Sequence, residues 1–162
     1  MLRDFWIWLD QFCETVEATP VSQTIQTVVW VIPTVQIIHI IGISAVMASA
    51  LVLNARLVGS MDRDQDVRRV MGRYLPVIWW TLPVLLATGV VMIVGEPGRS
   101  LKSPVFQAKV ALIILAMGHL WFCQRRLAAT PSGQGTNMAI LVFPSIVLWL
   151  GIVFCGRWIA YF

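Results

Sequence analysis

Charged residues are scarce in this chain, and their scarcity excludes most soluble folds. Only 12% of the 162 residues are charged, whereas soluble domains average about 25%. Gly-rich phosphate loops, a Ser/His/Asp arrangement and zinc-ligand spacings are all missing. The three cysteines, an odd number, form no disulfide framework. With 58% hydrophobic residues, the composition is instead that of an integral membrane protein.

Four long apolar segments predict the fold. Each is long enough to cross a hydrocarbon core about 30 Å thick as a helix. We therefore expect an all-α membrane domain covering residues 1–162, with an up-down-up-down four-helix bundle. The expected spans are residues 28–53, 75–95, 106–126 and 138–160. Small residues are expected at the contacts between helices, namely Gly42, Ala45, Ala48, Ser49 and Gly118.

The segment before the first span has a different pattern. Over residues 2–18, apolar side chains such as Phe5, Leu9 and Val16 recur at helical spacing, and acidic residues fill the other face. This pattern predicts an amphipathic helix lying in the membrane interface and ending near Pro20.

The basic residues indicate the orientation. Seven of the 12 Lys and Arg lie between the first two spans or at the end of the third, namely Arg56, Arg63, Arg68, Arg69, Arg73, Arg125 and Arg126. This distribution is typical of membrane topology rather than of nucleic-acid binding. We expect a multi-pass protein of the bacterial inner membrane with both termini on the periplasmic side.

The chain has only two histidines, His39 and His119, and both lie inside expected spans. Ionisable residues at that depth are rare and indicate a functional site. Counted from Val28 and Phe106, the two histidines lie roughly 16 and 20 Å into the membrane, so they are at nearly the same depth. On diagonal helices, two such imidazoles can bind one b-type haem from opposite faces. Gln36, Lys109 and Arg157 are the expected further haem contacts, with Gln26 also placed towards the propionates.

Two alternatives to haem stay open. The histidines could be structural, bonded to neighbouring helices. They could also belong to a copper site, because His119 and Cys123 are an i, i+4 pair on one helix face. Further soft ligands that suit Cu(I) are Met47, Met92, Met117 and Cys155.

Three functions follow from these alternatives. The first is a haem electron-transfer protein or subunit, rather than an independent enzyme, that relays electrons between a membrane donor such as quinone and a periplasmic redox partner. The second is a copper-handling membrane protein, and the third is a non-catalytic anchor or assembly subunit of a larger complex. A homo-oligomer is a further expected assembly.

Two stretches of the chain resemble an uncharacterised family of small bacterial inner-membrane proteins. They are Trp30 to Gly42, continuing to Ala55-Arg56-Leu57-Val58-Gly59, and Leu148 to Gly151, followed by the ending Gly156-Arg157-Trp158-Ile159-Ala160-Tyr161-Phe162. The family usually has an acidic residue where this chain has Gln36, and Asp before Leu-Arg where it has Asn54-Ala55-Arg56. The chain is also distantly similar to copper-resistance membrane proteins of the CopD type. The resemblance to the uncharacterised family implies the four-helix fold. The distant similarity to CopD-type proteins implies copper as the cargo.

Overall fold

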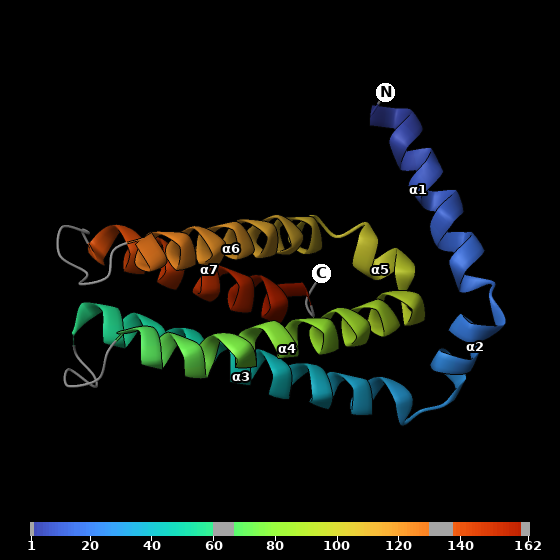
Figure 1. The fold of residues 1–162 in the computed structure, drawn as a ribbon. Helices are drawn as coiled ribbons and strands as arrows, with labels where there is room; N and C mark the ends of the chain where they lie inside the picture. Colours follow the sequence, from blue (N-terminus) through green and yellow to red (C-terminus); the bar gives the residue numbers. More distant parts are fainter. Residues whose placement is uncertain (1, 60–66, 130–137, 160–162) are drawn as a thin grey trace.

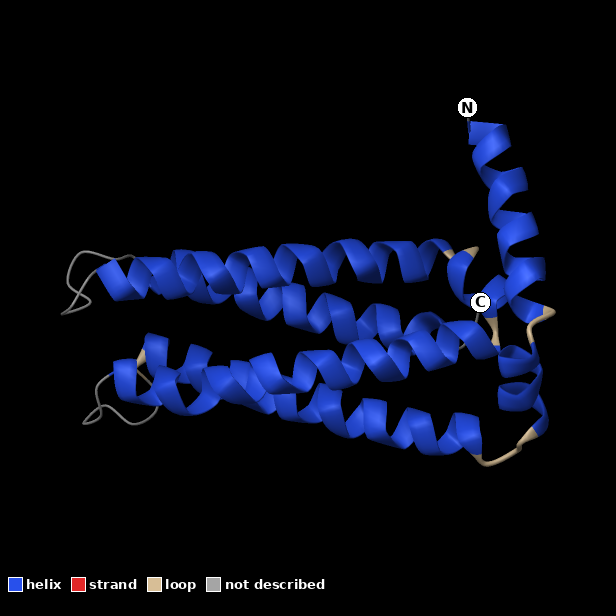
Figure 2. Cartoon of the chain, turned by 45° about the vertical axis from the view of Figure 1, so that its right-hand side comes forward, coloured by secondary structure: helices blue, strands red, loops and turns tan. Residues whose placement is uncertain are grey.

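The structure is a computed structural model that describes residues 2–59, 67–129 and 138–159. These residues are almost entirely helical (Figure 2). The helices are α1 (Leu2–Glu17), α2 (Pro20–Thr27), α3 (Val31–Val58), α4 (Val67–Gly95), α5 (Pro97–Leu101), α6 (Pro104–Ala129) and α7 (Met138–Trp158).

The four long helices form the expected bundle. α3 packs along α4, α6 packs along α7, and α3 also packs against α7 (Figure 1). All four are long and apolar enough to cross a membrane. The prediction of an all-α, up-down-up-down membrane bundle is therefore confirmed.

Several helix boundaries differ from the expectation, and α3 continues to Val58 rather than ending at residue 53. α4 begins at Val67 rather than at residue 75, because Val70, Met71, Tyr74 and Leu75 continue its apolar face towards α3 and α6. α3 begins at Val31, after the short helix α2 that the sequence did not predict. α5 was also missed, since five residues carry too little periodicity to be recognised.

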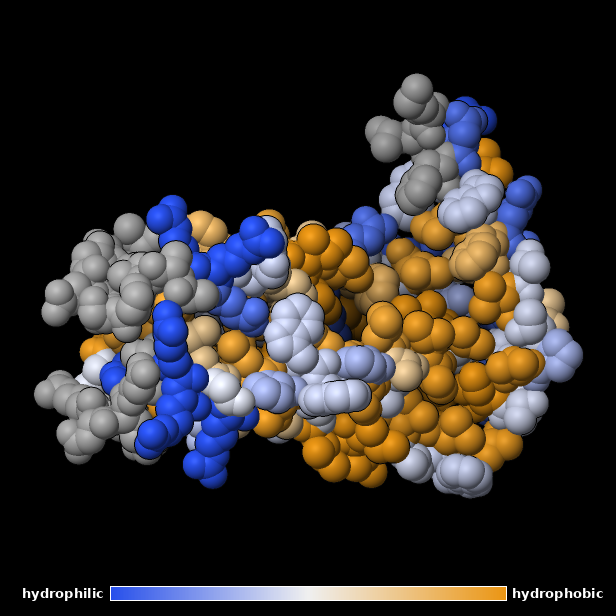
Figure 3. All heavy atoms as spheres, in the orientation of Figure 1, coloured by the Kyte–Doolittle hydropathy of each residue, from blue (hydrophilic) through white to orange (hydrophobic). Residues whose placement is uncertain are grey.

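The outer surface of the bundle is apolar on every long helix. Ile41, Leu86, Ile114 and Phe143 are each more than 60% exposed. A soluble protein would not expose an apolar surface of this extent, so these faces are suited to contact lipid. Exposed arginines gather at one end of the bundle (Figure 3), here called the basic end, from Arg68, Arg69, Arg73, Arg125 and Arg126.

The opposite end, here called the α5 end, carries α1, α2 and α5. α2 donates hydrogen bonds to backbone carbonyls in the last turn of α4, which have no hydrogen-bond partner within that helix. The Ser22 hydroxyl donates to the Val94 carbonyl at 2.7 Å, and the Gln26 side-chain amide donates to the Gly95 carbonyl at 2.9 Å. Gln26, expected to meet a haem propionate, is thus a cap for α4.

α1 runs across the α5 end, transverse to the long helices (Figures 1 and 2). It packs on α5 with Leu9 and Cys13 buried, while Trp8 and Phe12 stay exposed and stack on one another. Lys102 donates a hydrogen bond to Asp10, and this bond raises the pKa of Lys102 above its usual range. The transverse direction is the one expected of a helix that lies in the membrane interface.

Close packing of α3 on α4 uses some of the predicted small residues. Gly42 and Ser49 are buried, and a Cβ atom at Gly42 would lie 2.8 Å from Leu85 Cδ2. The prediction is wrong for Ala48 and Gly118, which are exposed. A Cβ at Gly118 would meet nothing within 4 Å, so that face of α6 has no packing partner among the described residues.

Candidate functional site

His39 lies in the interface between α3 and α4, towards the α5 end. Its Nδ1 atom is 2.7 Å from Oγ1 of Thr88, a buried residue of α4. The Thr88 hydroxyl has a single proton and donates it to its own helix, with the Val84 carbonyl 2.7 Å away. Thr88 therefore accepts from His39 Nδ1–H, which leaves His39 Nε2 as a hydrogen-bond acceptor.

Lys109 of α6 lies near His39 at the same end of the bundle. Its charge acts on the His39 imidazole, and the Cys155 thiol of α7 is within its electrostatic reach. The Lys109 ammonium rests against α7, where a Cβ atom at Gly156 would lie 3.6 Å from Nζ. His39 thus contacts α4 through Thr88, and Lys109 contacts α7 at Gly156, both in the half of the bundle at the α5 end.

His119 lies on the other side of the bundle, between α6 and α7. Its Nε2 atom is 2.8 Å from the Leu141 carbonyl oxygen, which can only accept, so Nε2 carries the proton. The Sγ atom of Cys123, one turn further along α6, is 3.4 Å from the same nitrogen.

A cavity of about 40 Å³ adjoins His119 and Cys123. It lies in the basic half of the bundle, and its lining includes Met71, Asn54, Gln124 and Ser145. Asn54 donates to the Ser145 hydroxyl at 3.1 Å, which joins α3 to α7. The side-chain nitrogen of Gln124 is buried with no hydrogen-bond partner. The cavity, here called the His119 cavity, is thus small, polar in part and lined by an amide that lacks a partner.

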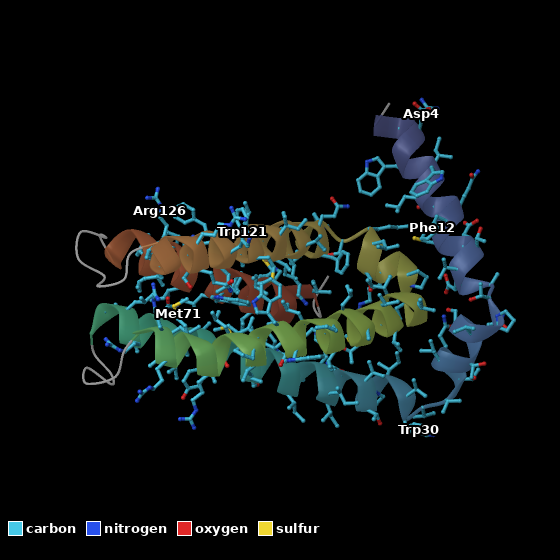
Figure 4. All side chains as sticks on the ribbon, viewed as in Figure 1. Asp4, Phe12, Trp30, Met71, Trp121 and Arg126 are labelled. Carbon is cyan, nitrogen blue, oxygen red and sulfur yellow. The ribbon has the colours of Figure 1, made fainter. Side chains whose placement is uncertain are left out.

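Met71 is a lining residue that the sequence analysis missed. It extends from α4 towards the α6 and α7 pair (Figure 4) and packs against the buried cluster of Cys123, Leu127 and Leu141. The expected start of the second span at residue 75 placed Met71 outside the bundle. The apolar residues Val70, Met71, Tyr74 and Leu75 have helical spacing and would have revealed the longer helix.

The structure does not bring the two histidines together. The α3 residues that line the His119 cavity begin at Ala50, eleven positions after His39 and so about 16 Å further along the helix. On α4, Thr88 is thirteen positions from Leu75 of the same lining, which is about 20 Å. The expectation that both imidazoles lie at one depth is therefore wrong.

A haem between His39 and His119 does not fit this arrangement. The axial ligands of one iron must face each other across the macrocycle. Here the two rings are separated along the bundle. The cavity beside His119 is also well below the roughly 300 Å³ of pockets that hold drug-sized ligands.

The remaining predicted haem contacts lie on the surface. Gln36 is exposed on α3, and Arg157 is exposed in the last turn of α7. Lys109 alone of the predicted contacts lies near His39 inside the bundle.

Within residues 2–59, 67–129 and 138–159, no three His, Cys, Asp or Glu side chains form a metal-binding group. Met71, His119 and Cys123 line the same cavity and offer one nitrogen and two sulfur atoms. Comparisons with protein family models, curated proteins and solved structures return no match for this chain.

Proposed function

We propose that this chain is a copper-handling membrane protein that holds Cu(I) as its cargo in the His119 cavity. His119, Cys123 and Met71 are the ligands. Imidazole, thiolate and thioether together are a soft donor set that selects Cu(I) over Mg²⁺ or Ca²⁺.

The separation between the His119 nitrogen and the Cys123 sulfur is the observation that carries the proposal. A metal bound about 2.0 Å from nitrogen and about 2.3 Å from sulfur at a tetrahedral angle holds these atoms about 3.5 Å apart. The observed separation is 3.4 Å. The two ligand atoms are therefore already spaced for one ion, and His119 Nε2 exchanges its hydrogen bond to the Leu141 carbonyl for the metal.

The cavity supports this assignment. Its volume of about 40 Å³ suits a single ion or a water molecule rather than an organic cofactor. Cu(I) bound to one thiolate is a neutral unit, so binding places no net charge inside the membrane. The unpartnered Gln124 amide and the Asn54–Ser145 bond surround this unit with polar groups.

Metal analysis of the purified chain tests the proposal. Protein produced with added copper and purified under reducing conditions should retain a stoichiometric amount of Cu(I) in competition with a Cu(I) chelator. It should show the ultraviolet charge-transfer band of a copper thiolate. Zinc and iron should stay at background, and a preparation that exchanges all its copper to a weak chelator would contradict the proposal.

Proton release gives a second test. Copper replaces the thiol proton of Cys123, and the His119 proton moves from Nε2 to Nδ1, so the imidazole stays neutral. One proton is therefore released per ion, and the apparent affinity should rise about tenfold per pH unit between pH 6 and 8. Titration calorimetry in two buffers of different ionisation enthalpy measures this number. No proton release would mean that Cys123 is not a ligand.

The proposal includes a bacterial inner membrane location with the basic end in the cytoplasm. Residues Glu14 and Arg69 are exposed at opposite ends and provide the test. In intact spheroplasts, an impermeant maleimide should label Glu14→Cys above the background of the native cysteines and leave Arg69→Cys unlabelled. The reverse labelling would invert the topology.

A further inference from the structure

We infer that the outer face of α6 at the basic end binds one anionic phospholipid. Arg125 and Arg126 hold its phosphate, and an open recess over Gly118 takes one of its acyl chains. The inference is independent of the copper site, because the His119 cavity lies on the inner side of the same helix.

Two arginines in the last turns of α6 each lie over an aromatic ring one turn earlier. The Arg125 guanidinium carbon is 3.9 Å from the centre of the Trp121 ring. The Arg126 guanidinium carbon is 5.1 Å from the centre of the Phe122 ring. Both arginines are exposed, and Figure 4 shows Trp121 and Arg126 on the outer side of α6. The rings restrict these long side chains and leave the N–H groups at the edge of each guanidinium for an anion.

No described carboxylate competes for these two cations. Within residues 2–59, 67–129 and 138–159, every Asp and Glu lies in α1 or at Glu96 beside α5, at the opposite end of the bundle (Figure 1). Guanidinium groups on consecutive residues suit a phosphate, whose several oxygens accept from both. At the end of a membrane helix, the phosphate of an anionic lipid is the group at the same level.

A recess lies on the same face of α6, here called the Gly118 recess. Gly118 is exposed, and a Cβ atom there would meet nothing within 4 Å. With about 3.6 residues per turn, Ile114 and Trp121 lie along one side of Gly118. Leu115 and Phe122 lie along the other side. All four of these side chains are at least 40% exposed, so two apolar ridges border the recess.

The order of these features along α6 matches a phospholipid. Arg125 follows Gly118 by seven positions, which is two turns, so it lies on the same face about 10 Å nearer the basic end. An acyl chain attached to a phosphate at Arg125 therefore extends over Gly118 towards the middle of the membrane. A free phosphate would use the arginines without the recess, and a second copy of the chain would use the recess without the charges.

Native mass spectrometry of the full chain in detergent tests the inference, with phosphatidylglycerol and phosphatidylcholine of identical acyl chains as probes. The first phosphatidylglycerol should bind wild type about twentyfold or more tightly than phosphatidylcholine does. Arg125→Gln should weaken phosphatidylglycerol binding about fivefold, and the further change Arg126→Gln should remove the preference. Neither change should alter the binding of phosphatidylcholine.

Gly118→Val fills the recess and keeps both arginines. It should weaken the binding of both lipids by a similar factor, because it removes the contact with the acyl chain and leaves the contact with the phosphate. All of these changes lie on the outer surface of α6, so the midpoint of thermal unfolding should stay that of wild type and show that the variants are folded.

Arg157→Gln is the matched control, since it removes an exposed arginine from the last turn of α7 at the opposite end. It should bind phosphatidylglycerol as wild type does. Equal losses in Arg157→Gln and Arg125→Gln, or equal binding of the two lipids by wild type, would overturn the inference. Complete displacement of the lipid by inorganic phosphate would assign the arginines to a free anion, and a wild-type dimer separated by Gly118→Val would assign the recess to a second copy. Either result would also overturn the inference.

Discussion

Cys123→Ser should abolish competitive Cu(I) binding and remove the copper thiolate band. Serine keeps the size and a hydrogen bond to His119, but its hydroxyl is a hard ligand that Cu(I) does not select. Changing an outer-shell partner of a metal already costs about 10–100-fold in affinity, so the loss of a direct ligand should exceed about 100-fold. His119→Ala should cause a comparable loss.

Cys155→Ser is the matched control, because Cys155 is a thiol in a membrane helix with no contact to the cavity. It should bind copper as wild type does. Met71→Leu keeps the apolar volume and removes the thioether, and it should weaken binding less than Cys123→Ser. If Cys155→Ser rather than Cys123→Ser lost the copper, the site would lie at the α5 end and the proposal would be wrong.

Gly42→Val should destabilise the bundle more than any comparable change on a lipid-facing surface. The first added carbon would meet Leu85 at 2.8 Å and Thr81 at 3.3 Å, and valine adds two further methyl groups. Overpacking of this kind costs about 1–3 kcal/mol, which should lower the midpoint of thermal unfolding by roughly 3–10 °C.

Gly118→Val is the control for this experiment, since a Cβ atom at Gly118 meets nothing within 4 Å. Both changes add the same side chain to the middle of a long helix. Unfolding of the two variants in one detergent, followed by circular dichroism, gives the comparison. Equal midpoints would show that α3 and α4 are not packed through Gly42 as described.

The fold could be predicted because membrane helices have a strong signal. Apolar length identifies each span, and the backbone has no other way to satisfy its hydrogen bonds in lipid. The signal weakens at the ends of the helices. The first two turns of α4 were not predicted, because Arg68, Arg69 and Arg73 lower the mean hydropathy there although the opposite face of the helix is apolar.

The site was harder to predict because the position of a residue along its own helix does not give its level along the axis of the bundle. The sequence gives the position of His39 in α3 and of His119 in α6, but not how far one helix is shifted along the other. That shift depends on side-chain contacts, such as Gly42 against Leu85 and Gly151 against Leu112. The sequence therefore identified the two histidines and the pair of His119 and Cys123, but it could not give the relative levels of His39 and His119 along the bundle.

The His39 environment illustrates the same limit. Lys109 was recognised as a polar residue near the outer side, but its proximity to His39 depends on the packing of α6 and α7 against α3. The bond between His39 and Thr88 could not be inferred either, because Thr88 resembles any other threonine within an apolar span. Both contacts arise between helices that are distant in sequence.

X-ray absorption at the copper edge of the loaded protein is the most direct test of the central claim, which is one Cu(I) bound by His119, Cys123 and Met71. The account predicts sulfur neighbours at about 2.3 Å together with a single imidazole at about 2.0 Å. The sulfur signal should fall in Cys123→Ser and stay unchanged in Cys155→Ser. A spectrum fitted by two imidazoles and no sulfur, lost in both His39→Ala and His119→Ala, would contradict the account and return the two histidines to a shared site.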